Sequence, residues 1–163
     1  MSIETIVSIS GVVVALLVGI FGWIITNNFN KNSIKHYEQT QKIENDRLMK
    51  ELFTEFNQRY DRINNKIDKI SRLSEDKWNN LKDEKKERYS GVVIDFFNIC
   101  AEEYHWHKEG RINGNIWASW HKGMNDIFNR SKVIQNIWDE ECEDEGYKSY
   151  YISKKDEIFT LNK

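Results

Sequence analysis

Proline is absent from this chain of 163 residues, and cysteine occurs only twice. Proline marks turns and interrupts helices, so its absence, together with abundant Lys, Glu, Asn and Ile, predicts an all-α fold. The two cysteines, Cys100 and Cys142, do not suggest a disulfide framework, and in a reducing cytosol both should be free thiols. A formal net charge of −2 gives the whole protein no basic field, so duplex nucleic acid is not an expected partner.

Charge is absent from Thr5 to Thr26, which read TIVSISGVVVALLVGIFGWIIT. As a helix rising about 1.5 Å per residue, this segment would be about 33 Å long, enough to cross a bilayer core of about 30 Å. A cleaved signal peptide fits poorly, because Lys and Arg are absent before the segment and the apolar run is too long. A core helix of a soluble protein would rarely stay uncharged over this length. We therefore expect residues 5–26 to form a transmembrane helix.

Basic residues follow this segment but do not precede it. They are Lys31, Lys35, Lys42, Arg47 and Lys50. The positive-inside rule then makes residues 1–4 a short periplasmic N-terminus and places the remainder in the cytoplasm. We expect a single-pass protein of a bacterial inner membrane.

Two patterns predict self-association. Gly11, Ala15 and Gly19 recur every four residues, and small residues at this spacing let helices approach closely in lipid, although glycine is also simply common in membrane helices. Residues 27–90 are expected to form a juxtamembrane hinge at 27–33 and a helical or coiled-coil stalk. Its apolar seam, spaced alternately three and four residues, comprises Phe53, Phe56, Tyr60, Ile63, Ile67 and Ile70. The seam would pair with a copy of itself or with the domain that follows.

Residues 91–163 are expected to form a small cytosolic helical sensor domain. A first helix starts near Gly91 and ends at Gly110, residues 111–115 form a loop, and a second helix covers 116–129. Ser131 is a candidate N-cap of a third helix, which Gly146 would stop, and a last helix is expected over 147–160. The charged stretch 74–88 fits either a helical turn or a linker.

Catalytic and metal-binding patterns were not found. The sequence has no Gly-rich phosphate loop, no Gly-x-Ser-x-Gly elbow, and no Arg followed by His four to six residues later. His105 and His107 lie two residues apart, so on a helix their side chains diverge by about 200° and cannot share a metal. We expect no enzyme activity, no metal and no cofactor.

Rings and cations alternate between Tyr104 and Arg130, a mixture that suits a nucleotide ligand, because aromatic rings stack on bases and cations bind phosphates. The candidate phosphate contacts are Lys108, Arg111, Lys122 and Arg130; the candidate base contacts are Trp106, His107, Asn113 and His121. The alternative is that the tryptophans are core residues and the cations are solvated.

The layout of one N-terminal span, a helical stalk and a small helical domain resembles small membrane effectors of CRISPR defence. The stretch DFFNICAEEYHWHKEGRINGNIWASWHKG also looks like a broad group of bacterial helical domains. One effector group belongs to type III systems and is gated by cyclic tetra-adenylate, which implies a tetramer around a symmetry axis. A second group accompanies an RNA-guided RNase and carries a degenerate nuclease-like fold; the missing Arg/His motif disfavours it here.

Two functions follow as hypotheses. In the first, the chain is a homo-oligomeric antiviral effector that binds a cyclic oligoadenylate between subunits and opens or disrupts the membrane. In the second, it is a membrane-tethered module or scaffold that holds a partner protein and binds no small molecule.

Overall fold

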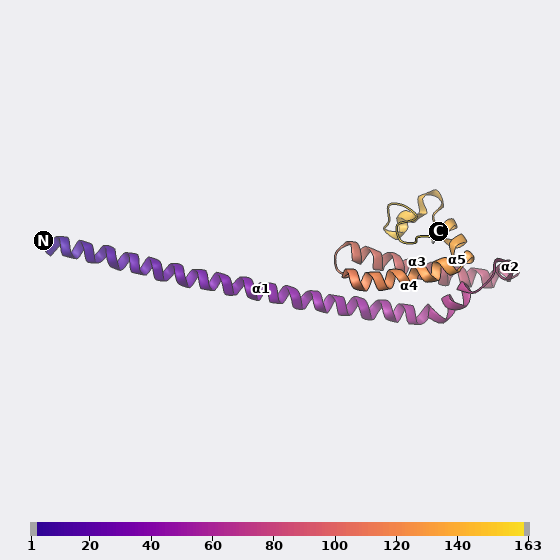
Figure 1. The fold of residues 1–163 in the computed structure, drawn as a ribbon, viewed down its shortest axis with the longest axis horizontal. Coiled ribbons are helices and arrows are strands. Elements are labelled where there is room, and N and C mark those ends of the chain that lie inside the picture. The colour runs from indigo at the N-terminus through magenta and orange to yellow at the C-terminus, as the bar shows by residue number, and fades with distance from the viewer. Residues whose placement is uncertain (1–2, 162–163) are drawn as a thin grey trace. The chain divides into compact units, whose positions relative to one another are not determined.

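The computed structural model describes the backbone of residues 3–161 and their side chains, apart from those of 4–9 and 12. Over this range the chain forms α-helices, one 3-10 helix and no strand, which confirms the all-α prediction. The elements are α1 (Ile3–Ser71), α2 (Glu75–Asn79), α3 (Asp83–Lys108), α4 (Gly114–Arg130), α5 (Lys132–Glu141) and the 3-10 helix η1 (Glu143–Tyr150) (Figure 1).

The chain divides into two compact units, Met1–Arg47 and Leu48–Lys163, and α1 contributes residues to both. Residues 27–33, expected as a hinge, are helical. This stretch contains neither proline nor glycine, and each asparagine disfavours a helix by well under about 1 kcal/mol, so nothing in it interrupts α1. The predicted N-terminal segment 1–4 lies partly outside the described residues.

In the first unit, α1 contains one stretch that is long and apolar enough to span a membrane, judged by its length and composition. None of this stretch is buried within the chain. Trp23, for example, leaves 68% of its surface exposed. The described apolar side chains of this stretch are therefore not buried by other residues of this unit.

In the second unit, the C-terminal part of α1 packs into the core. Phe56, Ile63, Ile67 and Ile70 are buried, the last two with no exposed surface (0%). The rings of Phe56 and Trp120 of α4 meet edge to face at 5.8 Å, and Tyr60 meets Phe96 of α3 in the same way. The apolar seam therefore packs against the domain that follows it in the same chain, which is one of the two partners considered for it.

Helices α3 and α4 lie side by side in this unit, joined by a tight turn (Figure 1). Gly110 has φ of 70° just beyond the end of α3, which confirms it as the helix terminator. Asn113 caps α4 through a hydrogen bond from Ile116 N, and Ser131 caps α5 through one from Ile134 N, as predicted for Ser131. Helix α3 begins earlier than expected, within the charged stretch.

The prediction of a last helix over 147–160 is wrong. Helix α5 ends at Glu141, before Gly146, and η1 is followed by irregular chain. The buried residues there are Tyr150, Ile152, Ile158 and Phe159. Positions 150 and 152 lie on opposite faces of a helix, so a surface helix with one buried face could not bury this set. The Phe159 ring stacks on Phe128 at 4.6 Å and completes the core from the C-terminal segment.

Candidate functional site

Four rings from α3 and α4 form what we call the aromatic–histidine stack: Tyr104, His107, Trp117 and His121. The His107 and Trp117 rings are nearly parallel, with centroids 4.8 Å apart and 9° between their planes. His121 lies 5.1 Å from Trp117, and Tyr104 lies 5.5 Å from it. The structure thus brings together the two histidines proposed as base contacts, one from each helix.

Both histidines are oriented by backbone carbonyls. His107 Nδ1 lies 3.1 Å from the Ile112 oxygen, and His121 Nε2 lies 2.9 Å from the Ile158 oxygen. A carbonyl oxygen can only accept, so each of these ring nitrogens carries the proton and donates. The first bond holds the turn after α3, and the second ties α4 to the C-terminal segment. These nitrogens are therefore used within the fold.

Three of the four predicted phosphate contacts are paired with carboxylates of the same chain. Lys108 Nζ lies 3.2 Å from Glu157 Oε1, Lys122 bonds Asp126 one turn along α4, and Arg130 reaches Asp68 at 3.3 Å. The fourth, Arg111, is solvent-exposed. The cations therefore do not converge on one anion site.

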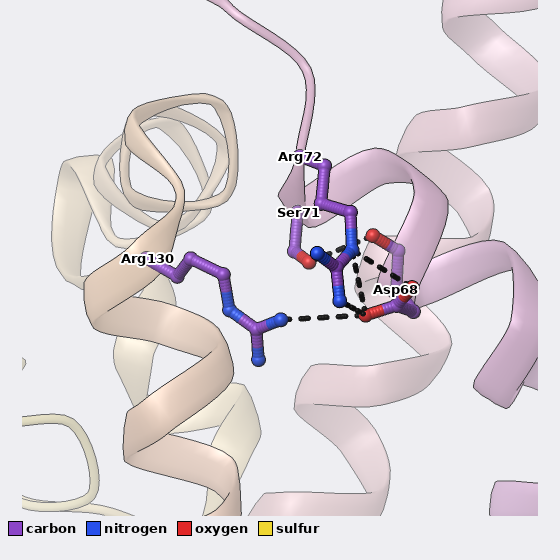
Figure 2. Close-up of polar contacts among 4 residues, drawn as sticks. All are labelled: Asp68, Ser71, Arg72 and Arg130. Carbon is purple, nitrogen blue, oxygen red and sulfur yellow. Dashed lines mark hydrogen bonds and ion pairs between the residues drawn. The ribbon is translucent and has the colours of Figure 1, made fainter.

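Arg130 lies apart from the aromatic–histidine stack, at the C-terminal end of α4. Figure 2 shows it and Arg72 both directed at the Asp68 carboxylate near the end of α1. The hydrogen bond from Arg72, followed by the charges of both guanidiniums, lowers the pKa of Asp68. This cluster joins α4 to the end of α1 at the surface, where solvent screens ion pairs.

Glu157 connects the C-terminal segment to the stack. Its carboxylate accepts hydrogen bonds from Ser153 N at 2.7 Å, Tyr104 Oη at 2.9 Å and Lys108 Nζ at 3.2 Å. The Ser153 bond, then those of Tyr104 and Lys108, lower the pKa of Glu157 to about 2. The negatively charged Glu157 carboxylate thus lies beside the aromatic–histidine stack, where an anionic ligand was expected to bind.

The remaining predicted residues have structural or peripheral positions. Asn113 Oδ1 is occupied by the α4 cap. Trp106 is half-buried against the core, and its carbonyl oxygen accepts from Arg111 N and Ile112 N. Gly11, Ala15 and Gly19, which were predicted to pack between transmembrane helices, are exposed. Ala15 and Gly19 border a shallow apolar groove with Leu16, Ile20 and Trp23.

One buried carboxyl was missed from the sequence. Glu103 is only 2% exposed, and its Oε2 has no hydrogen-bond partner in the structure. Burial raises the pKa of Glu103 to about 8, so it holds a proton at neutral pH. Helical periodicity could have shown it, because Glu103 follows Phe96 by seven residues and Cys100 by three, on the core face.

Among the described residues, no group of three or more His, Cys, Asp or Glu side chains is arranged to hold a metal ion. Cys100 and Cys142 are buried free thiols, and burial raises the pKa of both. Comparison with known protein families, with curated proteins and with solved structures gives no match.

Proposed function

We propose that the chain is a single-pass membrane protein whose second unit acts as a cytoplasmic interaction module, without a small-molecule ligand at the aromatic–histidine stack. We favour an interaction module over a nucleotide sensor because Lys108, Lys122 and Arg130 are paired with carboxylates of the chain. A phosphate ligand would have to displace these partners and approach Glu157, which is anionic.

The membrane assignment rests on the apolar part of α1. Its large side chains are exposed, including Leu16 (61%) and Phe21 (65%). Burying one such side chain is favourable by about 1.5–3 kcal/mol, so a bilayer would stabilise this stretch strongly where no protein covers it. The basic residues that follow favour the orientation with the second unit in the cytoplasm of a bacterial cell.

A second candidate is the antiviral effector of a CRISPR system, gated by a cyclic oligoadenylate bound between the subunits of a tetramer. The pre-formed stack supports it, because the His107 and Trp117 rings already stack between two helices and the tilted His121 ring lies beside Trp117. Ligand binding would then have to favour one of two oligomeric arrangements, and the spans would permeabilise the membrane.

The two candidates differ in what the full chain binds in lipid nanodiscs. We expect calorimetric titration with cyclic tetra-adenylate to show no saturable heat at micromolar ligand, and a tagged chain purified from its native membrane to retain one stoichiometric protein partner. Saturable binding that Trp117→Leu abolishes, with Trp78→Leu as the control, would instead establish the effector.

Self-association through the small-residue face of α1 is part of both candidates. We expect Gly11→Ile with Gly19→Ile to weaken oligomers of the full chain in micelles, because the added side chains keep the helices apart. The matched control is Val13→Ile with Leu17→Ile, on the other side of the helix. Equal oligomer populations in all three proteins, measured by cross-linking, would reject this interface.

A further inference from the structure

A concave site lies in the folded unit, and none of its lining residues belongs to the aromatic–histidine stack. It is a pocket of about 210 Å³ between the C-terminal part of α1, α3 and α4. It is lined by Asn57, Tyr60, Glu103, Ser119, Trp120, Gly123, Met124 and Ile127. Asn57, Ser119 and Gly123 are exposed and form its mouth, whereas Glu103 and Met124 are buried and form its floor.

Glu103 lines this pocket, and one oxygen of its carboxyl group is unsatisfied. Glu103 Oε2 is buried without a hydrogen-bond partner, and leaving such a group unpaired is unfavourable. The apolar lining residues Met124 and Ile127 offer it no strong donor. A ligand that enters the pocket and donates a hydrogen bond to this carboxyl would remove the penalty.

The charged side chains around Glu103 determine whether a neutral or a positively charged hydrogen-bond donor is favoured in the pocket. Burial has the largest effect on the pKa of Glu103 and raises it; the charge of Arg59 lowers this pKa, and the charge of Glu102 raises it. Arg59 is committed to Glu102 through two hydrogen bonds of 2.5 and 2.8 Å, and Glu55 lies within 4.0 Å of it. One guanidinium therefore faces two other carboxylates, and an ionised Glu103 would leave the region negative.

The walls suit a cation as well. Tyr60 of α1 and Trp120 of α4 place aromatic rings in the lining, and such rings attract an ammonium, most strongly where it is desolvated. The α4 lining residues carry no titratable group. From α1 the nearby titratable groups are Glu55, Arg59 and Tyr60. From α3 they are Glu102 and Cys100, and the Cys100 thiol shares a hydrogen bond of 3.6 Å with Tyr60 Oη.

We propose that this pocket binds an organic ammonium group, which donates a hydrogen bond to Glu103 and lies against Tyr60 and Trp120. The ammonium belongs either to a small free amine or to the lysine side chain of a peptide. The inference does not depend on the proposed function, since it concerns a different site. Binding ionises the Glu103 carboxyl, so the proton leaves to solvent as the cation enters.

The test uses the full chain in nanodiscs at pH 6.5, with n-butylammonium and Nα-acetyl-lysine methylamide as probes and n-butanol as the neutral analogue. Empty nanodiscs correct for partition into lipid. We expect saturable binding of at least one ammonium probe, at least tenfold tighter than n-butanol, with close to one proton released when heats are compared in two buffers. Tighter binding of n-butylammonium assigns the site to free amines; tighter binding of the lysine probe assigns it to a peptide.

Two variants locate the binding. Glu103→Gln should abolish the preference for ammonium over n-butanol and the proton release, because the amide cannot ionise. Gly123→Leu should block the mouth and weaken binding at least tenfold; nothing lies within 4 Å of a Cβ added there. Gly91→Leu, at an equally open exposed position of α3, is the matched control.

A measurement on the unaltered chain keeps the proposal falsifiable if a variant fails to fold. The carboxyl ¹³C resonance of Glu103 should titrate at a lower pH when n-butylammonium is present. No preference over n-butanol, or an unchanged titration of Glu103 at saturating probe, would overturn the proposal and leave a pocket that holds only water.

Discussion

Glu103 makes the stability of the second unit depend on pH. Its pKa is about 8 in the folded chain, raised by burial from an ordinary 4.5. Between these values the folded chain holds a proton that the unfolded chain lacks, so the contribution is fully present below pH 4.5 and is lost as pH rises through about 8. We expect the free energy of unfolding to fall by up to about 1.4 kcal/mol per pH unit in this window.

The measurement is urea unfolding of the full chain in micelles at pH 5 and pH 8, followed by tryptophan fluorescence. Five of the six tryptophans lie in Leu48–Lys163 and report on that unit. Glu103→Gln should flatten the pH dependence, whereas Glu109→Gln, at an exposed position, should retain it. Parallel profiles for the wild-type chain and Glu103→Gln would show that Glu103 ionises normally in the fold.

Glu157 should act in the opposite direction and at acid pH. Its folded pKa is about 2, lowered first by the hydrogen bond from Ser153 N and then by Tyr104 and Lys108. Its contribution is therefore present above pH 4.5 and lost as pH falls through about 2. We expect Glu157→Gln to lower the free energy of unfolding at pH 7 by about 1–2 kcal/mol, by removing charge-assisted hydrogen bonds.

Circular dichroism and fluorescence melts of the full chain test this expectation, with Glu143→Gln at an exposed position as the control. If Glu157→Gln melts like the wild-type chain at pH 7, the network around Glu157 contributes nothing to stability.

At the scale of the elements, the junction between α5 and η1 depends on one glycine. A Cβ at Gly146 would meet the Glu141 carbonyl oxygen far inside van der Waals contact. Gly146→Ala should therefore force the junction apart and lower stability by about 1–3 kcal/mol. Gly123→Ala, in the interior of α4 with open space around it, should raise stability by about 0.5–1 kcal/mol.

Thermal melts of both variants beside the wild-type chain measure the contrast. Two shifts of the same sign would mean that the close approach of Gly146 to Glu141 does not constrain the fold.

The features that the sequence predicted correctly are those that depend on residues close by in the chain. Gly110 and Ser131 act through contacts within a few residues, so their roles as terminator and cap were readable in advance. The partner of the apolar seam was not, because the spacing of Phe56 and Ile63 specifies a buried face but not what covers it. The irregular C-terminal segment was missed because its register is set by distant contacts, such as Phe159 with Phe128.

The candidate site shows the same limit. The cluster of rings and cations was visible in the sequence, and the structure does bring His107 close to Trp117. The carboxylates that pair with the cations were not foreseen, since Glu157 and Asp68 are 49 and 62 residues away from Lys108 and Arg130. A residue's availability for a ligand depends on such tertiary partners.

At the scale of the whole molecule, membrane attachment should depend on α1 alone. Val14→Lys with Leu17→Lys places two charges in the apolar stretch, each unfavourable by about 2.5–3.5 kcal/mol at the centre of a spanning helix. We expect the chain to move from the carbonate-washed membrane fraction to the supernatant of a bacterial host, with the fluorescence of its second unit unchanged.

The matched control is Gln39→Lys with Gln41→Lys, in an exposed polar part of the same helix, which should stay in the membrane fraction. Retention of the Val14 and Leu17 variant in washed membranes would mean that something other than this stretch attaches the chain.

Phe159 has a consequence for how the protein is made. Its ring contacts Phe97, Phe128 and Trp138, so the core of the second unit is incomplete until residue 159 has left the ribosome. At about 5–20 residues per second, translation delivers the apolar part of α1 many seconds earlier. The insertion machinery would thus bind α1 before the second unit folds. Until residue 159 is available, the aromatic residues of the unfolded second unit would stay accessible to chaperones.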